Sequence, residues 1–234
     1  MISVTIVGRG NVGTHLWKAL QNAEGIKVTH IDSRHLEAIE KSDVAIIAVS
    51  DDAIGEVSSQ VNNDFVVHTS GSVSMNGLTN TGNKGVFYPL QTFTKDNEID
   101  FTNIPFCLES DDPMGLDILE SLVKVLNGNI FHVNSDQRKR LHVAAVFVNN
   151  FTNHMYVIAH EICSQYNIPF DILEPLIIET CKKIKSISPL DAQTGPAKRN
   201  DEETIQNHLN LLNQSQQEIY IKLTESIQTY GKKL

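Results

Sequence analysis

A glycine-rich segment near the N-terminus constrains the possible folds of this chain more than any other feature. Residues 8–13 form a GxGxxG motif that directly follows a β-branched run at residues 2–7 and directly precedes a helical pattern. Such a turn brings backbone N–H groups and the positive end of a helix dipole towards a bound pyrophosphate. In this context the motif favours a dinucleotide-binding turn over a glycine-rich turn without a ligand. The residues expected to contact the dinucleotide are Gly8, Gly10, Asn11, Val12 and Gly13.

Short β-branched runs alternate with helical patterns through the first half of the chain, as is typical of βαβ units around a parallel sheet. Strands are predicted at residues 2–7, 27–31, 44–49, 65–68, 85–87, 105–109 and 129–133, and helices at 12–21 and 113–126.

The pattern becomes purely helical in the second half of the chain. Residues 135–166 contain neither proline nor glycine, and their apolar residues recur at helical spacing, which predicts one long helix. Further helices are predicted at residues 170–185 and after Asn200, where Asn200 and Glu203 have the spacing of a capping box. The predicted fold class is α/β, with a Rossmann-like dinucleotide-binding domain at residues 1–133 and an all-α C-terminal domain at residues 134–234.

Composition narrows the partners of the chain. Its 28 acidic and 19 basic residues give a formal net charge of −9, so its surface is expected to repel nucleic acid. No apolar run approaches the ~18 residues of a membrane helix, and the N-terminus lacks the features of a secretion signal. The three cysteines are widely spaced, which fits reduced thiols in a cytoplasm. We expect a cytoplasmic protein without nucleic-acid or membrane partners, and no metal, because His154 and His160 do not share a helix face.

Residues at the end of the second predicted strand are expected to contact the adenosine ribose and so to distinguish NAD from NADP. Asp32, followed by Ser33 and Arg34, lies at about the expected 20 residues beyond the glycine turn. An Asp would accept from a ribose 2′-OH and favour NAD, whereas a Ser-Arg pair would donate to a 2′-phosphate and favour NADP. We expect NADP, contacted by Ser33 and Arg34, with NAD as the other possibility.

A second contact with the dinucleotide is expected where the central strand ends. Val49, Ser50 and Asp51 lie at this point, and such positions usually lie over the cofactor at the C-terminal edge of a parallel sheet. The simpler alternative is that Ser50 or Asp51 caps the next helix.

The long predicted helix carries a polar stripe on a mostly apolar background. His142, Asn149 and Asn153 recur on one face, with Asn150 beside them. Polar groups on so apolar a helix need partners. Either other helices satisfy them, or they line a cleft that holds a substrate carbonyl or imine.

Four blocks of residues stand out along the second half of the predicted sheet and the helical region. They are residues 68–72 (HTSGS), 87–93 (FYPLQTF), 141–151 (which include LHVAA and NNF) and 193–209 (which include QTGPAKRND and HL). In this order they resemble the signature blocks of a family of uncharacterised NADP-dependent oxidoreductases, which is related to pyrroline-5-carboxylate reductase, ketopantoate reductase and the 6-phosphogluconate dehydrogenase-like enzymes. The resemblance implies a Rossmann-like domain, a helical C-terminal domain of unknown function and NADP as the cofactor.

Two positions depart from the relatives. Tyr88 stands where the family usually has a histidine, so a proton-transfer role of that imidazole would pass to a phenol, whose reference pKa is much higher. The catalytic lysine that some relatives carry three residues before an Asn-Asn pair is replaced by Val146. Both departures favour the alternative of a non-catalytic regulatory or sensing protein that binds a dinucleotide.

The main hypothesis is an NADP-dependent oxidoreductase that transfers a hydride between nicotinamide and a small C=O or C=N substrate in a cleft between the domains. His142 is the candidate proton donor, since its reference pKa near 6.5 suits neutral pH. Asn150 would position the substrate, and Ser70 would supply donors near the nicotinamide. Arg199 would bind a substrate carboxylate or phosphate, unless it simply pairs with Asp201 or Glu202.

The helical domain is also expected to form a homodimer. An apolar stripe in this domain needs a partner surface, which either the long helix or a second copy of the chain would supply. The stripe consists of Ile205, Leu209, Leu212, Ile219 and Leu223.

Overall fold

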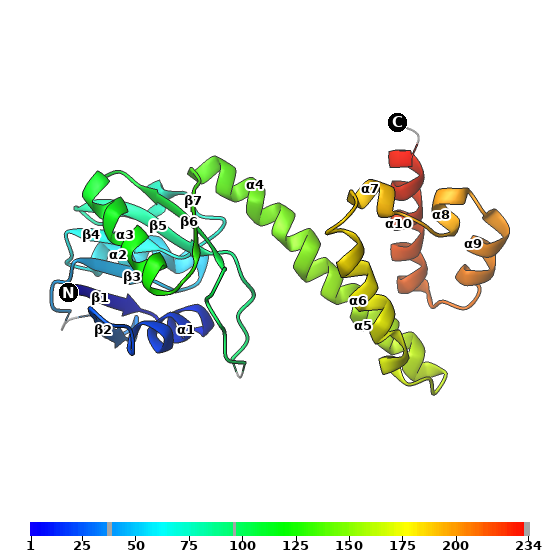
Figure 1. Cartoon of the computed structure of the whole chain (residues 1–234), viewed down its shortest axis with the longest axis horizontal. Helices are drawn as coiled ribbons and strands as arrows, with labels where there is room; N and C mark the ends of the chain where they lie inside the picture. Colours follow the sequence, from blue (N-terminus) through cyan, green and yellow to red (C-terminus); the bar gives the residue numbers. More distant parts are fainter. Residues whose placement is uncertain (37–38, 96, 232–234) are drawn as a thin grey trace. The chain divides into compact units, whose positions relative to one another are not determined.

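The computed structural model describes residues 1–36, 39–95 and 97–231. The chain divides into two compact units, residues 1–150 and residues 151–234 (Figure 1). The first compact unit thus extends beyond the predicted division at 133/134. The division by function, into a dinucleotide-binding and a helical domain, stays a prediction.

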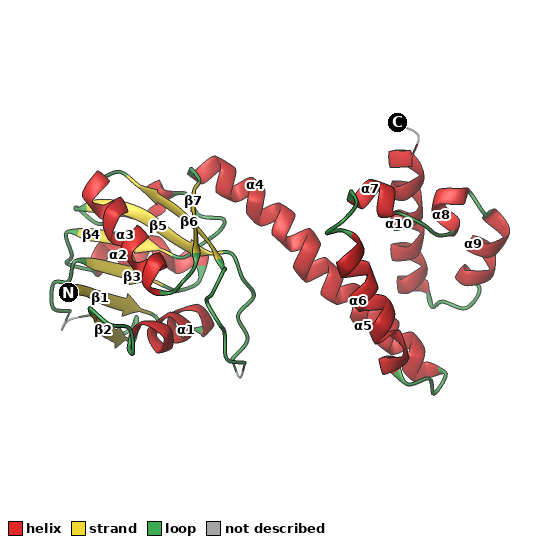
Figure 2. Ribbon diagram, viewed as in Figure 1, coloured by secondary structure: helices red, strands yellow, loops and turns green. Residues whose placement is uncertain are grey.

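A mostly parallel sheet forms the centre of the first unit (Figure 2). Its strands are β1 (Ile2–Val7), β2 (Ile26–Ile31), β3 (Val44–Ile47), β4 (Phe65–His68), β5 (Asn83–Pro89), β6 (Pro105–Ser110) and β7 (Asn129–His132). The seven strands lie in the order β2-β1-β3-β4-β5-β6-β7, and all neighbours are parallel except β5 and β6. The predicted Rossmann-like α/β fold class is confirmed.

Helices cover both faces of this sheet, because alternate residues of each buried strand point to opposite sides. Ile6 of β1 belongs to a buried cluster with Leu16 of α1 (Asn11–Leu20) and Leu119 of α3 (Pro113–Val125). Its neighbour Val7 belongs to a second cluster with Val57 of α2 (Ile54–Gln60). The 3₁₀ turns η1 (Asp51–Ala53) and η2 (Met75–Gly77) flank α2.

The long predicted helix is interrupted by a π-helical segment. In place of one regular helix at 135–166, the chain forms α4 (Ser135–Ala145), the π-helix η3 (Val146–Phe151) and α5 (Thr152–Gln165). A capping box between Asn134 and Gln137 begins α4.

The second unit is helical, as predicted. After α5 it contains η4 (Phe170–Leu173), α6 (Glu174–Lys183), α7 (Pro189–Ala192), α8 (Pro196–Arg199), α9 (Glu202–Leu209) and α10 (Gln214–Gly231). The predicted capping box at Asn200 is wrong. Asn200 has a left-handed backbone (φ 54°) that ends α8, while the Asp201 side chain caps α9 by accepting from the Thr204 N–H at 3.2 Å. None of the described helices combines the length and apolar character that crossing a bilayer requires.

Candidate functional site

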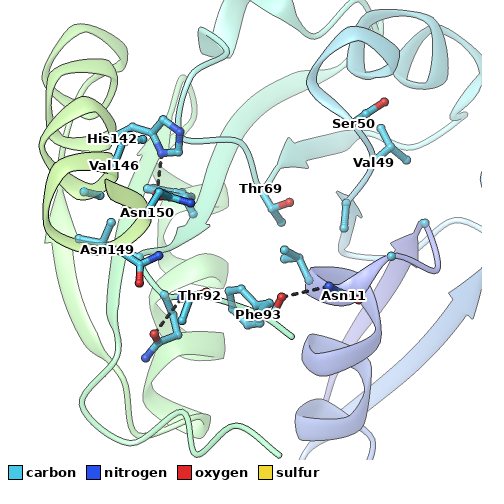
Figure 3. Close-up of a pocket in the computed structure, with 18 of the residues that line it drawn as sticks. Asn11, Val49, Ser50, Thr69, Thr92, Phe93, His142, Val146, Asn149 and Asn150 are labelled. Atoms are coloured by element: carbon cyan, nitrogen blue, oxygen red, sulfur yellow. Dashed lines mark hydrogen bonds between the residues drawn. The ribbon is translucent and has the colours of Figure 1, made fainter. Parts of the chain in front are cut away.

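A pocket of about 1000 Å³ opens at the C-terminal edge of the sheet in the first unit. Residues just beyond β1, β2, β3 and β4 line one side of it, and residues of α4 and η3 line another. Figure 3 shows Asn11, Val49 and Ser50 on the sheet side, opposite His142 and Asn149 of the helical side. The C-terminal edge is where open α/β sheets bind their ligands.

The three motif glycines have different tasks in the turn. Gly8 has a φ of +114°, and a Cβ there would lie 2.3 Å from the Ala48 carbonyl oxygen, so the fold itself requires this glycine. A Cβ at Gly13 would lie 2.2 Å from the Gly8 carbonyl oxygen, so glycine at this position lets α1 pack closely against the turn. A Cβ at Gly10 would meet nothing within 4 Å, and Gly10 lines the pocket. Only at Gly10 is the missing side chain explained by space for a ligand.

The start of α1 can receive an anion. Gly10 is the N-cap and no side chain caps this end of the helix, so its first N–H groups are available. Asn11 and Val12 line the pocket as predicted, and the Asn11 amide donates to the Phe93 carbonyl at 3.0 Å (Figure 3). This contact ties the turn to the segment after β5. The arrangement fits a pyrophosphate.

Of the residues after β2, one lines the pocket and two form an ion pair at the surface. Ser33 lines the pocket, whereas Arg34 does not. The Arg34 guanidinium instead donates to both carboxylate oxygens of Asp32, at 2.9 and 2.7 Å. These bonds hold the pKa of the Asp32 carboxyl well below its ordinary value. Arg9, within the glycine motif, is a cationic lining residue that the sequence reasoning did not single out.

The segments after β3 and β4 contribute Val49, Ser50 and Thr69 to the lining. Ser50 stands at the N-cap of η1, but its side chain makes no capping bond, so the capping alternative does not account for its hydroxyl. Asp51 lies in the first turn of η1 and is not a lining residue.

The turn after β4 is built around Ser70. Its buried hydroxyl accepts from the backbone N–H groups of Ser72 and Val73, both at 3.0 Å, and Ser70 does not line the pocket. The neighbouring Gly71 packs against the imidazole of His142: a Cβ at Gly71 would lie 2.5 Å from Nδ1. The predicted donor role of Ser70 stays a prediction.

The helical wall of the pocket contains His142, Asn149 and Asn150. His142 lies on α4, and both asparagines lie on the π-helix η3. Single-turn π-helical segments occur frequently at functional sites. Tyr88, at the end of β5, also lines the pocket, and its hydroxyl lies 3.0 Å from Nδ1 of His142.

Arg199 lies in the second unit, on α8. Its guanidinium is exposed and lies 3.7 Å from the carboxylate of Asp201. This is the surface pairing that was weighed as the alternative, and a substrate-binding role of Arg199 stays a prediction.

A buried network holds the start of α4 against the sheet. Arg138 is fully buried and bonds to the Glu109 carboxylate of β6 and to the Val73 carbonyl, and Glu109 also accepts from the Ser135 N–H and hydroxyl. Arg138 lies four residues before His142 and therefore on the same helix face. The sequence reasoning missed Arg138, although this spacing could have indicated it.

Two buried groups in this region have shifted pKa values. Burial, helped by the positive charge of Arg138, lowers the pKa of His68 to about 4. Its Nδ1 accepts from the Ser70 N–H, so Nε2 carries the hydrogen and donates to the Ser74 carbonyl. Burial also raises the pKa of Tyr88 to about 12, which keeps the phenol protonated at neutral pH. Among the described residues no group of three or more His, Cys, Asp or Glu could hold a metal ion.

These features define an α/β protein of the Rossmann-like class, with its ligand pocket at the glycine turn and the C-terminal edge of the sheet. Comparison with known proteins assigns the chain more narrowly. It belongs to the family described as Domain of unknown function (DUF2520), which matches residues 104–227. No curated protein matches the chain.

Solved structures agree with this assignment. A protein from Bacteroides fragilis, described as a candidate NADP oxidoreductase, is 36% identical with a TM-score of 0.88, and the match covers 97% of this chain and 98% of that one. This similarity confirms the family resemblance inferred from the sequence blocks.

More distant structures share the fold. A 1-pyrroline-5-carboxylate reductase from Streptococcus pyogenes is 12% identical with a TM-score of 0.64, over 100% of this chain and 99% of that one. An imine reductase from Myxococcus stipitatus, in complex with NADP+, is 16% identical with a TM-score of 0.62, over 99% of this chain and 93% of that one. The chain thus shares its fold with these two reductases.

Proposed function

We propose that the protein is an NADP-dependent oxidoreductase that transfers a hydride between nicotinamide and a small C=O or C=N substrate. The observation that carries this proposal is that one pocket is lined both by the glycine turn and strand ends and by the polar residues of α4 and η3. The similarity to the Bacteroides fragilis protein supports the same class of reaction. When bound, NADPH supplies the hydride, and the protein supplies orientation and a proton.

Different residues along the pocket would bind the cofactor, donate a proton and hold the substrate. Backbone N–H groups at Gly10 and Asn11 bind the pyrophosphate, and Ser33 contacts the ribose. His142 donates a hydrogen to the substrate atom that receives the electron pair, within hydrogen-bond reach or through one water. The amides of Asn149 and Asn150 hold the substrate beside it.

The preference for NADP is assigned to cations near the ribose end. Arg9 lines the pocket, and Arg34 neutralises Asp32, whose carboxylate would otherwise repel a 2′-phosphate. Arg34 therefore favours NADP in two ways, by direct contact once it leaves Asp32 or by masking the Asp32 charge.

A homodimer and a cytoplasmic location complete the proposal. The second unit exposes many large apolar side chains, among them Ile172 and Leu176, each 64% exposed, as expected of a surface that a second copy covers. Cys107, Cys163 and Cys181 are all free, which fits a reducing cytoplasm.

Calorimetric titration with NADPH tests the proposed function. We expect the wild type to bind and Gly10→Val to lose binding, because the valine would occupy the space left for the pyrophosphate. The variant should still fold, since its side chain meets no protein atom near Cβ. Gly55→Ala on α2, where a Cβ has ordinary contacts and the residue does not line this pocket, serves as the control. Unchanged NADPH affinity in Gly10→Val would place the pyrophosphate elsewhere, and absence of binding in the wild type would overturn the proposal.

A further inference from the structure

Tyr88 and His142 form a hydrogen-bonded pair in the pocket, although they lie 54 positions apart in the sequence. Tyr88 ends β5 and His142 lies on α4, and the phenol oxygen is 3.0 Å from Nδ1 of the imidazole. The rings meet edge to face, with centroids 6.0 Å apart and planes at 71°. Both residues line the pocket.

The surrounding backbone is shaped to this pair. A Cβ at Gly71 would lie 2.5 Å from Nδ1 and 2.8 Å from Cγ of His142, and 2.9 Å from Cζ of Tyr88. Glycine at position 71 therefore lets the turn after β4 close over the Nδ1 side of the ring. One helical turn away, the buried Arg138 network holds α4 in place. The Nδ1 side of the imidazole therefore lies against the Tyr88 hydroxyl and the backbone at Gly71.

We propose that Tyr88 is a positioning residue of this site: its hydroxyl donates to Nδ1 of His142, so that Nε2 is the ring nitrogen that presents a hydrogen to the substrate. This inference rests on the proposed function for its consequence, but the pairing itself can be measured without a substrate.

The direction of the hydrogen bond follows from the chemistry of the two groups. A phenol that remains protonated at neutral pH carries a hydrogen that needs an acceptor, and an unprotonated Nδ1 is the acceptor within reach. A neutral imidazole with Nδ1 as acceptor carries its own hydrogen on Nε2. Within the described part of the chain, Nε2 of His142 has no hydrogen-bonding partner.

The consequence concerns which forms of His142 can donate to the substrate. Imidazolium carries a hydrogen on Nε2 and can transfer it, and the neutral tautomer that Tyr88 selects keeps Nε2 as a hydrogen-bond donor. With the other neutral tautomer, Nε2 would be an acceptor and could not donate to a substrate oxygen or nitrogen.

The second unit contains a matched pair. The Tyr220 hydroxyl lies 2.8 Å from Nδ1 of His208, and these rings also meet edge to face, with centroids 5.9 Å apart. This pair does not line the pocket, so it provides a control with the same chemistry.

Long-range proton–nitrogen spectra of the full chain labelled with ¹⁵N-histidine test the inference, with His142 assigned by its loss in His142→Gln. We expect neutral His142 to carry its hydrogen on Nε2 in the wild type. Tyr88→Phe should give a mixture of neutral tautomers, because the bond that holds Nδ1 as an acceptor is lost. Gly71→Ala, which displaces the ring, should give the same mixture, whereas Tyr220→Phe should change His208 alone.

Two results would overturn the inference: a hydrogen on Nδ1 of neutral wild-type His142, or identical tautomer spectra of His142 in wild type and Tyr88→Phe. NADPH titration of the same samples separates this failure from failure of the proposed function. Normal NADPH binding with a tautomer that does not depend on Tyr88 would remove only the inference. Absence of NADPH binding with a tautomer that does depend on Tyr88 would remove only the proposed function.

Discussion

The two compact units bury their apolar residues to very different extents. In residues 1–150, two clusters on opposite faces of the sheet contain many fully buried aliphatic and aromatic side chains, including Leu119 and Phe106. In residues 151–234, the described residues classed as buried are Cys163, Ala197 and Gln216. Large apolar side chains of the second unit, such as Leu176, remain exposed instead.

This difference indicates that the two units obtain their stability differently. Burial of apolar surface is the dominant favourable term in folding, so the first unit carries its own source of stability. The second unit leaves surface uncovered that a partner copy would bury, as the proposed homodimer requires. Four predictions test this contrast, beginning with the largest expected effect.

Truncating a leucine in the core of the first unit should have the largest effect. Leu119→Ala removes a side chain with no exposed surface and is expected to lower the free energy of unfolding by about 2–5 kcal/mol. Urea denaturation should show this loss at every protein concentration, because the contacts lie within one chain. Leu119→Met, which keeps the volume, is expected to cost less than about 1.5 kcal/mol. A small loss in Leu119→Ala would contradict the description of a well-packed core.

Acid should destabilise the first unit through His68. Its pKa is about 4 in the folded chain, against about 6.5 when unfolded, so the unfolded state binds the proton first as the pH falls. The contribution is fully present above pH ~6.5 and is lost between pH ~6.5 and ~4, in total roughly 3 kcal/mol. Urea denaturation across this range should show the loss in wild type and in a variant of the exposed His154, but not in His68→Gln. Equal losses in His68→Gln would assign the acid sensitivity to other groups.

The preference for NADPH over NADH should depend on Arg34 of the first unit and not on Arg199 of the second. Arg34→Ala is expected to weaken NADPH binding by about 1.5–3 kcal/mol, roughly tenfold to a hundredfold, and to leave NADH binding nearly unchanged. Arg199 also pairs with an aspartate two positions away, so Arg199→Ala is the matched control for cofactor binding. Calorimetry with both cofactors measures the effect.

Two more variants identify how the selectivity arises. If Arg34 acts by masking Asp32, adding Asp32→Asn to Arg34→Ala should restore NADPH affinity; if it contacts the phosphate directly, the double variant stays weak. Arg9→Ala that weakens NADPH and NADH equally would assign Arg9 to the pyrophosphate. Equal NADPH and NADH affinities in the wild type would contradict the preference itself.

The smallest effect within a single chain is expected at Leu176. This side chain is 64% exposed, so Leu176→Ala should change the stability of an isolated chain by no more than about 0.5 kcal/mol. In the proposed homodimer the cost should grow with protein concentration, since association stabilises the folded state by mass action. Light scattering at micromolar concentration should give twice the 26.0 kDa chain mass. A single-chain mass, with no concentration dependence, would contradict the homodimer.

Local patterns were sufficient to predict most of the first unit. The strands at 2–7 and 65–68 have the predicted bounds, and the other predicted strands are found with shifted ends. These segments are short β-branched runs bounded by turn residues, so the information lies within each segment. The π-helix at 146–151 and the cap at Asp201 were not predicted, because neighbouring structure decides between helical forms and between adjacent capping residues.

The sequence by itself determined the glycine turn, the order of strands and helices and the family. Each of these depends on residues that act within a few positions of one another, or on blocks that occur in a fixed order. Only the tertiary structure decided that Gly71 makes room for His142 and that Tyr88 meets His142 across 54 positions. Such contacts arise when the packing of the sheet brings distant segments together, and no local spacing encodes them. The hydrogen-bonding partner of an imidazole, and hence its protonation, is therefore a property of the folded chain.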